Sequence, residues 1–151
     1  MARNSMTVTV RIDGARQVLQ AFRGLPREAD QALRDASGKL AATLAVRVQG
    51  AARSDSRQAA LMGPTVRVVR DRLPAIVIGG STRVGRKRKP AYKILFGSEF
   101  GSNRLKQFRP HLGSHSYWAL RTISENEKTM SAEWNRAADR VVRAFGSGGP
   151  R

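Results

Sequence analysis

The sequence predicts an α+β fold, in which a small, mainly antiparallel sheet packs with two long helices in the order β-α-α-β-β-loop-α. Three observations predict it: apolar and polar residues alternate near the N-terminus, β-branched residues cluster mid-chain, and two long segments carry apolar residues at helical spacing. A chain of 151 residues is the size of one domain. We assign residues 1–145 to this domain and residues 146–151 to a flexible Gly/Pro tail.

The first predicted element is a half-buried strand over residues 6–12. Its alternation places four apolar side chains on the inner face, namely Met6, Val8, Val10 and Ile12. A short helix is predicted over residues 15–22, because its larger apolar residues share one helical face.

The first long helix is predicted over residues 27–52. Pro26 suits the first turn of a helix. The apolar residues that follow at helical spacing are Leu33, Leu40, Leu44 and Val48. Many alanines lie between them, which indicates close packing against a sheet or a second helix. One further helical turn is predicted over residues 58–62.

A β-hairpin is predicted from two segments rich in β-branched residues, residues 65–70 and 73–78, with Asp71 and Arg72 at the turn. Pro74 near the start of the second strand indicates an edge position in the sheet. A sheet of three strands has open edges, which favours pairing between subunits.

The remainder of the chain is predicted to be a loop, a strand and a helix. Residues 79–90 form the loop, and residues 97–102 form a Gly-punctuated strand and turn. The last helix begins near Tyr117, or at the capping box that starts at Thr122, and runs to Phe145.

The charge of the chain is its strongest functional signal. Lys and Arg number 28 against 11 Asp and Glu, which gives a net charge of +17. Such a surplus favours nucleic acid, an acidic protein surface or anionic lipid as a partner, although an arginine-rich genome produces the same composition.

Much of this charge is concentrated between residues 80 and 110, where Glu99 is the only acid. The basic residues there are Arg83, Arg86, Lys87, Arg88, Lys89, Lys93, Arg104, Lys106 and Arg109. No helix-turn-helix, RNA-recognition or zinc-finger motif accompanies them, so any DNA contact is expected to be to the backbone and salt-sensitive. The alternative is a loop that faces solvent or another subunit.

Several classes of site are disfavoured by the sequence. The chain has no cysteine, and no segment approaches the roughly 20 apolar residues of a membrane span. The N-terminus lacks the apolar core of a signal peptide, so we expect cytoplasmic synthesis.

The two histidines give a metal site little support. His111 and His115 lie four residues apart, but Pro110 and Gly113 disfavour the helix that would bring them together. A small nuclease would need a cluster of acids to hold Mg²⁺, and no such cluster occurs. We therefore expect no enzyme activity, no cofactor and no metal.

The motifs in the second half resemble those of a known family. Glu99-Phe100-Gly101 matches a Glu-Phe-Gly motif, residues 107–110 match a Phe/Pro-rich turn, and Tyr117-Trp118 lead into the last helix. With the order of elements, these motifs resemble the neck and minor-tail family of long-tailed bacteriophages, the tail-completion or head–tail connector proteins. The versions from actinobacterial phages are most similar.

The resemblance has two departures. The loop that carries His111 and His115 is longer than the compact turn of many members. The basic run over residues 86–89 is also not expected of every member.

The resemblance implies a structural virion protein that is not an enzyme. It would form a ring, expected to be hexameric, between the portal–adaptor complex and the tail terminator or tail tube, around a channel through which DNA passes. Glu99 would pair with an arginine of another subunit, and Phe100 would anchor an interface. The full set of candidate interface residues is Phe96, Glu99, Phe100, Phe108, Arg109, Tyr117 and Trp118.

The alternative function is a basic protein that binds nucleic-acid backbones or associates with the ribosome. It rests on the same basic residues, which in the first hypothesis contact DNA or an acidic neighbour.

Overall fold

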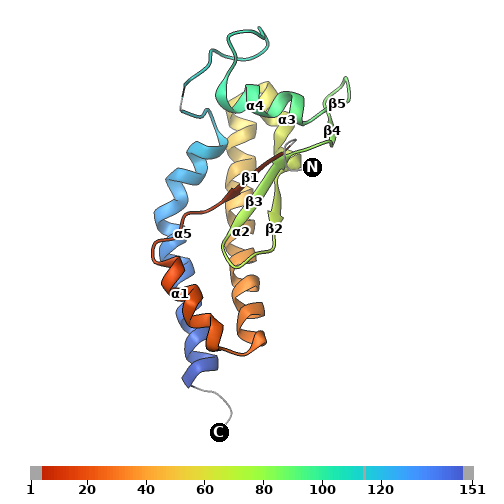
Figure 1. Cartoon of the computed structure of the whole chain (residues 1–151). Coiled ribbons are helices and arrows are strands. Elements are labelled where there is room, and N and C mark those ends of the chain that lie inside the picture. Colours follow the sequence, from red (N-terminus) through yellow and green to blue (C-terminus); the bar gives the residue numbers. More distant parts are fainter. Residues whose placement is uncertain (1–4, 114, 148–151) are drawn as a thin grey trace.

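The computed structural model describes residues 5–113 and 115–147 and has the predicted α+β fold. Two long helices run antiparallel along the molecule, with the small sheet packed against them (Figure 1). The helices are α1 Ala15–Ala21, η2 Phe22–Gly24, α2 Arg27–Asp55, α3 Arg57–Met62, η3 Gly63–Thr65, α4 Tyr92–Phe100, α5 Ala119–Val142 and η4 Arg143–Ser147. The strands are β1 Ser5–Thr9, β2 Arg67–Val69, β3 Ala75–Gly79, β4 Arg83–Val84 and β5 Lys89–Pro90.

The main sheet is antiparallel, with the strand order β1-β3-β2. The predicted hairpin is confirmed as β2 and β3. The predicted edge position of Pro74 is wrong, because β3 lies in the centre of the sheet. Pro74 is tolerated there because it precedes the strand, and its carbonyl oxygen accepts a hydrogen bond from the Val10 amide at 2.8 Å.

The core lies between α2, α5 and the inner face of the sheet. Leu33, Leu44 and Val48 of α2 are fully buried, as predicted from their spacing. Trp134 of α5 is also fully buried, and its indole Nε1 donates hydrogen bonds to Ser37 Oγ at 3.0 Å and to the Arg72 carbonyl at 2.9 Å. This indole therefore joins both long helices to the hairpin turn.

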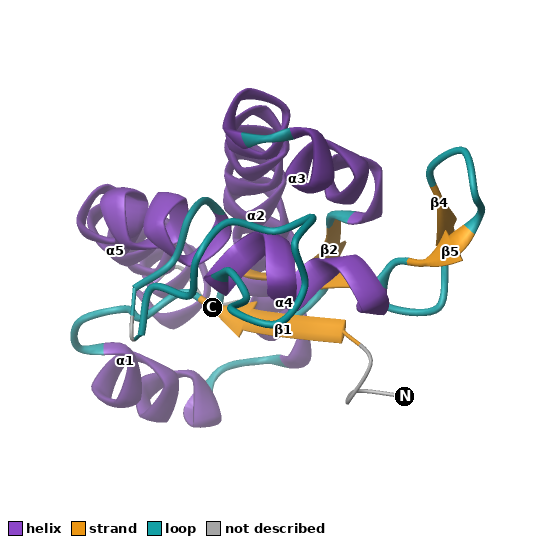
Figure 2. Cartoon of the chain, turned by 90° about the horizontal axis from the view of Figure 1, so that it is seen from above, coloured by secondary structure: helices purple, strands orange, loops and turns teal. Residues whose placement is uncertain are grey.

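Two local predictions differ from the structure. The loop over residues 79–90 contains a second, two-stranded sheet of β4 and β5, which projects from the body of the molecule (Figure 2). Residues 92–100 form the helix α4 and not a strand and turn. Together with Ala91, which precedes the helix, the buried residues of α4 are Ile94, Leu95, Ser98 and Glu99. Their spacing is helical, but two of them are polar, so the hydrophobic pattern of the sequence does not show it.

The bounds of the first strand and of the last helix differ from the predicted bounds by a few residues. β1 ends at Thr9, earlier than predicted, but Val10 and Ile12 beyond it are still buried. The last helix begins at Ala119, one turn before the capping box. Of the predicted tail, Gly146 and Ser147 belong to η4, and residues 148–151 lie outside the described residues. Within the described ranges, no helix is both long and apolar enough to cross a membrane.

Candidate functional site

Glu99 caps the last helix from inside the protein. Its side chain is fully buried, and its Oε1 accepts hydrogen bonds from the amides of Trp118 at 3.2 Å and Ala119 at 2.8 Å. Its Oε2 accepts a third from the Leu120 amide at 2.7 Å. These are donors that the first turn of a helix leaves without an intrahelical partner. Trp118 at the cap position cannot accept them with its own side chain, so a residue of α4 caps α5.

The environment of this carboxyl acts on its pKa in two directions. Burial raises the pKa of Glu99 above its usual value, and this effect prevails over the three amide hydrogen bonds and the Ser116 hydroxyl, which lower it. The structure places Glu99, which was expected to pair with an arginine of another subunit, inside the chain. No part of the side chain reaches the surface, because both carboxylate oxygens face the start of α5.

Phe108, predicted as an interface residue, and Trp118, predicted as a core or interface residue, also lie inside the chain. Phe108 is 8% exposed and packs against Gly97 so closely that a Cβ there would lie 2.4 Å from the ring. Trp118 is 1% exposed, and its Nε1 donates to Ser98 Oγ at 3.3 Å. Both rings therefore hold the α4–α5 loop, described over residues 101–113 and 115–118, onto α4.

Arg109 and Tyr117 brace the same loop. The Arg109 guanidinium lies 3.7 Å from the centre of the Tyr117 ring and forms an ion pair with Asp55 at the end of α2. The Tyr117 hydroxyl donates to the Pro110 carbonyl at 2.7 Å. Within this chain both side chains have intramolecular partners, so their first role is to shape the loop.

Phe96 and Phe100 differ from Glu99, Phe108 and Trp118 because they reach the surface. They lie one turn apart on α4, with ring centroids 6.5 Å apart and ring planes at 7°. Phe96 is 42% exposed, and Phe100 is half-buried. The Glu-Phe-Gly motif is thus divided: the acid faces the core, while the phenylalanine faces outward.

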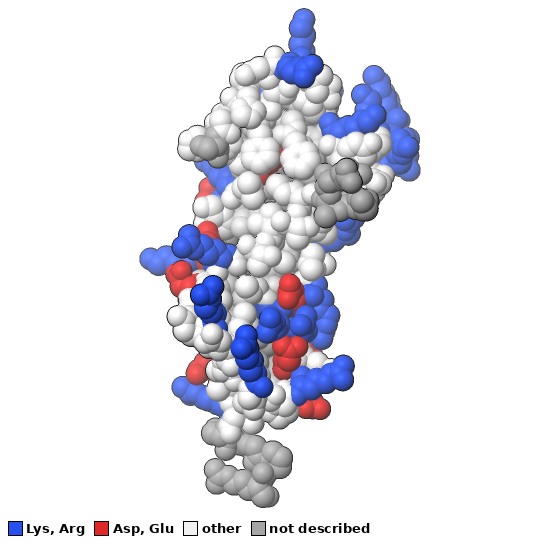
Figure 3. Space-filling model, in the orientation of Figure 1, with Lys and Arg blue, Asp and Glu red and all other residues white. Residues whose placement is uncertain are grey.

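The predicted basic residues lie on three elements. Arg83, Arg86, Lys87, Arg88 and Lys89 belong to the β4–β5 hairpin, Lys93 to α4, and Arg104 and Lys106 to the loop over residues 101–118. All of them are exposed. Lys and Arg gather at the end of the molecule that carries this hairpin, whereas acidic residues mix with them towards the other end (Figure 3).

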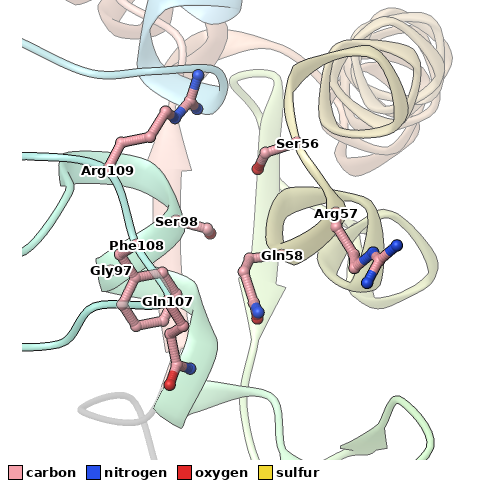
Figure 4. A pocket seen from close by; sticks show the side chains of 8 residues that line it. All are labelled: Ser56, Arg57, Gln58, Gly97, Ser98, Gln107, Phe108 and Arg109. Carbon is pink, nitrogen blue, oxygen red and sulfur yellow. The ribbon is translucent and has the colours of Figure 1, made fainter.

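A groove separates α3 from α4 and the hairpin, and we call it the α3–α4 groove. It consists of two depressions of about 230 and 380 Å³ that share Arg57, Gln58 and Gln107. In the first, Ser56, which caps α3, and Gln58 of α3 lie across from Phe108 and Gln107 (Figure 4). The second is lined on its hairpin side by Arg86, Lys87 and Lys89.

The tertiary structure selects among the predicted cations. Arg86, Lys87 and Lys89 line the groove, and Arg109 lines its first depression. Arg83, Arg88, Lys93, Arg104 and Lys106 do not line either depression. Sequence reasoning missed Arg57, which is distant in the chain. The available signal for Arg57 was its place directly after a predicted helix break, where a charged residue is expected to be exposed.

The histidines lie in the loop over residues 101–118 and are exposed. His111 Nδ1 accepts a hydrogen bond from the Gly113 amide at 3.0 Å. Over residues 5–113 and 115–147, no group of three or more His, Asp or Glu side chains is placed to hold a metal ion.

No protein-family model, curated protein or solved structure matches this chain.

Proposed function

We propose that this protein is a structural subunit of a ring at the head–tail junction of a long-tailed bacteriophage. The observation that carries the proposal is the stacked pair of Phe96 and Phe100, which α4 presents at the surface. Exposed aromatic residues on a firmly held element are typical of protein–protein contacts. The inward Glu99 holds that helix in place, so the motif acts as a presented surface and not as a catalytic group.

The open edges of the main sheet support the same proposal. Within the described residues, β1 and β2 each pair on one side only, with β3. α4 lies across the end of the sheet where β1 begins, in both Figure 1 and Figure 2. The aromatic pair and the start of β1 therefore lie at the same end of the molecule, where we propose that a neighbouring subunit contacts them.

In this role the chain joins the portal–adaptor side of the neck to the tail terminator or tail tube. We expect a hexameric ring in the virion, with DNA passing through its lumen. This role requires no catalytic step, because such a protein acts through contacts between subunits.

The proposal is tested by complementation of a phage from which this gene is deleted. Heads filled with DNA and finished tails should accumulate separately, and the purified protein should join them into whole particles visible by negative-stain electron microscopy. Phe100→Ala should fold normally and join fewer particles, because it removes one ring of the stacked pair.

The matched control is Val46→Ala, since Val46 of α2 is 64% exposed and lies outside α4. It should join particles as well as the wild type. Whole particles that form in the absence of the chain would refute the proposed function. Normal joining by Phe100→Ala would refute the role of the aromatic pair alone.

The alternative, a protein that binds nucleic-acid backbones outside any virion, is favoured by one observation, the cationic α3–α4 groove. Sizing the protein with and without DNA, together with the joining of heads and tails, separates the two. A salt-sensitive DNA complex together with failure to join heads and tails would favour the alternative.

A further inference from the structure

The α3–α4 groove has an unusual charge balance. In the described part of the chain, its lining includes Arg57, Arg86, Lys87, Lys89 and Arg109 and contains no Asp or Glu. Arg109 is occupied by its ion pair with Asp55. The ion pairs of the described residues involve none of the other four cations, all of which are exposed.

These four cations come from two walls of the groove. Arg57 begins α3, whereas Arg86, Lys87 and Lys89 belong to the hairpin that projects from the body. Holding like charges near one another costs energy unless an anion lies between them. The amides of Gln58 and Gln107, which line both depressions, add neutral hydrogen-bond donors to the same groove.

From this arrangement we infer that the α3–α4 groove binds the phosphate backbone of duplex DNA. A duplex presents one phosphate charge about every 1.7 Å of helix axis, so cations on two walls find partners in any base sequence. The Arg57 guanidinium supplies a planar fork for phosphate oxygens, and the lysines supply point charges. Contacts of this kind position DNA without reading its sequence.

The lining also argues against the other polyanions. Among the described residues, Phe108 is the only aromatic residue that lines the groove, and it is 8% exposed with its ring packed on Gly97. It offers no stacking platform for unpaired bases and no anchor of the kind that dominates protein interfaces. The exposed aromatic pair of α4 lies outside both depressions.

This inference rests on the proposed function, which places DNA in the lumen of the ring, and it assigns to one groove the task of holding that DNA. A groove that neutralises about four phosphates gives a slope of about −3 to −4 when the logarithm of the affinity is plotted against that of the salt concentration. Affinity for duplex should then fall roughly 100-fold between about 50 and about 200 mM salt.

The test measures fluorescence anisotropy of a labelled duplex of about 20 base pairs with the full chain. The groove variant changes Arg57, Arg86, Lys87 and Lys89 to Gln. The far-end variant makes the same change in charge at Arg16, Arg23, Arg136 and Arg140, which are exposed on α1, η2 and α5 at the end of the molecule opposite the hairpin.

The groove variant should bind duplex at least about 30-fold more weakly near 50 mM salt and show a slope near zero, whereas the far-end variant should keep the wild-type slope. Equal losses in both variants would mean that net charge alone governs binding and would overturn the inference. So would competition by polyglutamate at the same charge concentration as DNA. If the groove variant does not fold, Lys87→Gln at the hairpin tip should reduce the slope by about one.

Joining of heads and tails is measured in parallel, because the two proposals fail differently. A wild-type chain that joins them without binding duplex overturns the groove inference alone. A chain that binds duplex through the groove and does not join them overturns the proposed function alone.

Discussion

The cap that α4 provides for α5 predicts a large loss of stability in Glu99→Ala. The truncation removes the acceptor of three amides, at Trp118, Ala119 and Leu120, in a site where the glutamate is fully buried. Loss of an N-cap costs about 1 to 2 kcal/mol, and each buried donor that stays without a partner costs about 1 to 3 kcal/mol. Water that enters the space satisfies part of this demand, so we expect a total loss of about 3 to 4 kcal/mol.

The assay is urea denaturation followed by tryptophan fluorescence. Both tryptophans, Trp118 and Trp134, are buried, so unfolding changes their surroundings. A loss of about 3 to 4 kcal/mol should lower the midpoint of thermal unfolding by on the order of 10 °C in a chain of this size. Because Trp118 adjoins the cap, its signal reports both local and global unfolding.

The matched control is Glu125→Ala in the same helix. Glu125 is exposed and pairs with Arg121 at 3.3 Å, one turn away. Exposed pairs of this type contribute less than about 0.5 kcal/mol, so this control should unfold almost as the wild type does. A loss below about 1 kcal/mol in Glu99→Ala would refute the argument that this carboxylate holds α5 in place.

Three further predictions follow from the same contacts. Gly97→Ala should lower the free energy of unfolding by about 1 to 3 kcal/mol, because the added methyl group meets the ring of Phe108. Gly38→Ala, with open space around it, should raise the free energy of unfolding by up to about 1 kcal/mol. Equal effects of the two substitutions on the urea midpoint would contradict this. Arg109→Lys should lose about 0.5 to 1.5 kcal/mol in the same assay, because an ammonium does not reproduce the stacked fork over Tyr117, and an unchanged midpoint would show that the stacking contributes nothing. Burial raises the pKa of Glu99, so at pH values just above its usual pKa of 4.5 the folded chain keeps a proton that the unfolded chain has released. The free energy of unfolding of the wild type, relative to that of Glu99→Gln, should therefore fall as the pH rises through these values. A rise would show that the pKa is shifted in the opposite direction.

The long elements could be predicted because their signals are local. Leu33, Leu44 and Val48 repeat at helical spacing, and this period alone places them on the buried face of α2. The β2–β3 hairpin followed from β-branched residues on both sides of a short turn.

The errors have the opposite cause, since each depends on residues far apart in the chain. The segment around Glu99 is a helix and not the predicted strand. The prediction is wrong because Ser98 and Glu99 are buried, whereas a hydrophobic pattern assigns polar residues to the solvent-facing side. Pro74 predicts an edge position for the second strand of the hairpin, and no local signal reveals that β1, some 70 residues earlier by the pairing of Ser5 with Gly79, pairs with its other side.

By itself, the sequence determined the α+β class, the two amphipathic helices and the concentration of positive charge, since composition and periodicity are properties of neighbouring residues. Only the tertiary structure decided which way the Glu-Phe-Gly segment faces and which cations meet. Glu99 turns inward because the amides at the start of α5 need an acceptor, and Phe100 is thereby turned outward with Phe96. Arg57 joins the basic hairpin across a groove that forms only when α3 packs beside α4.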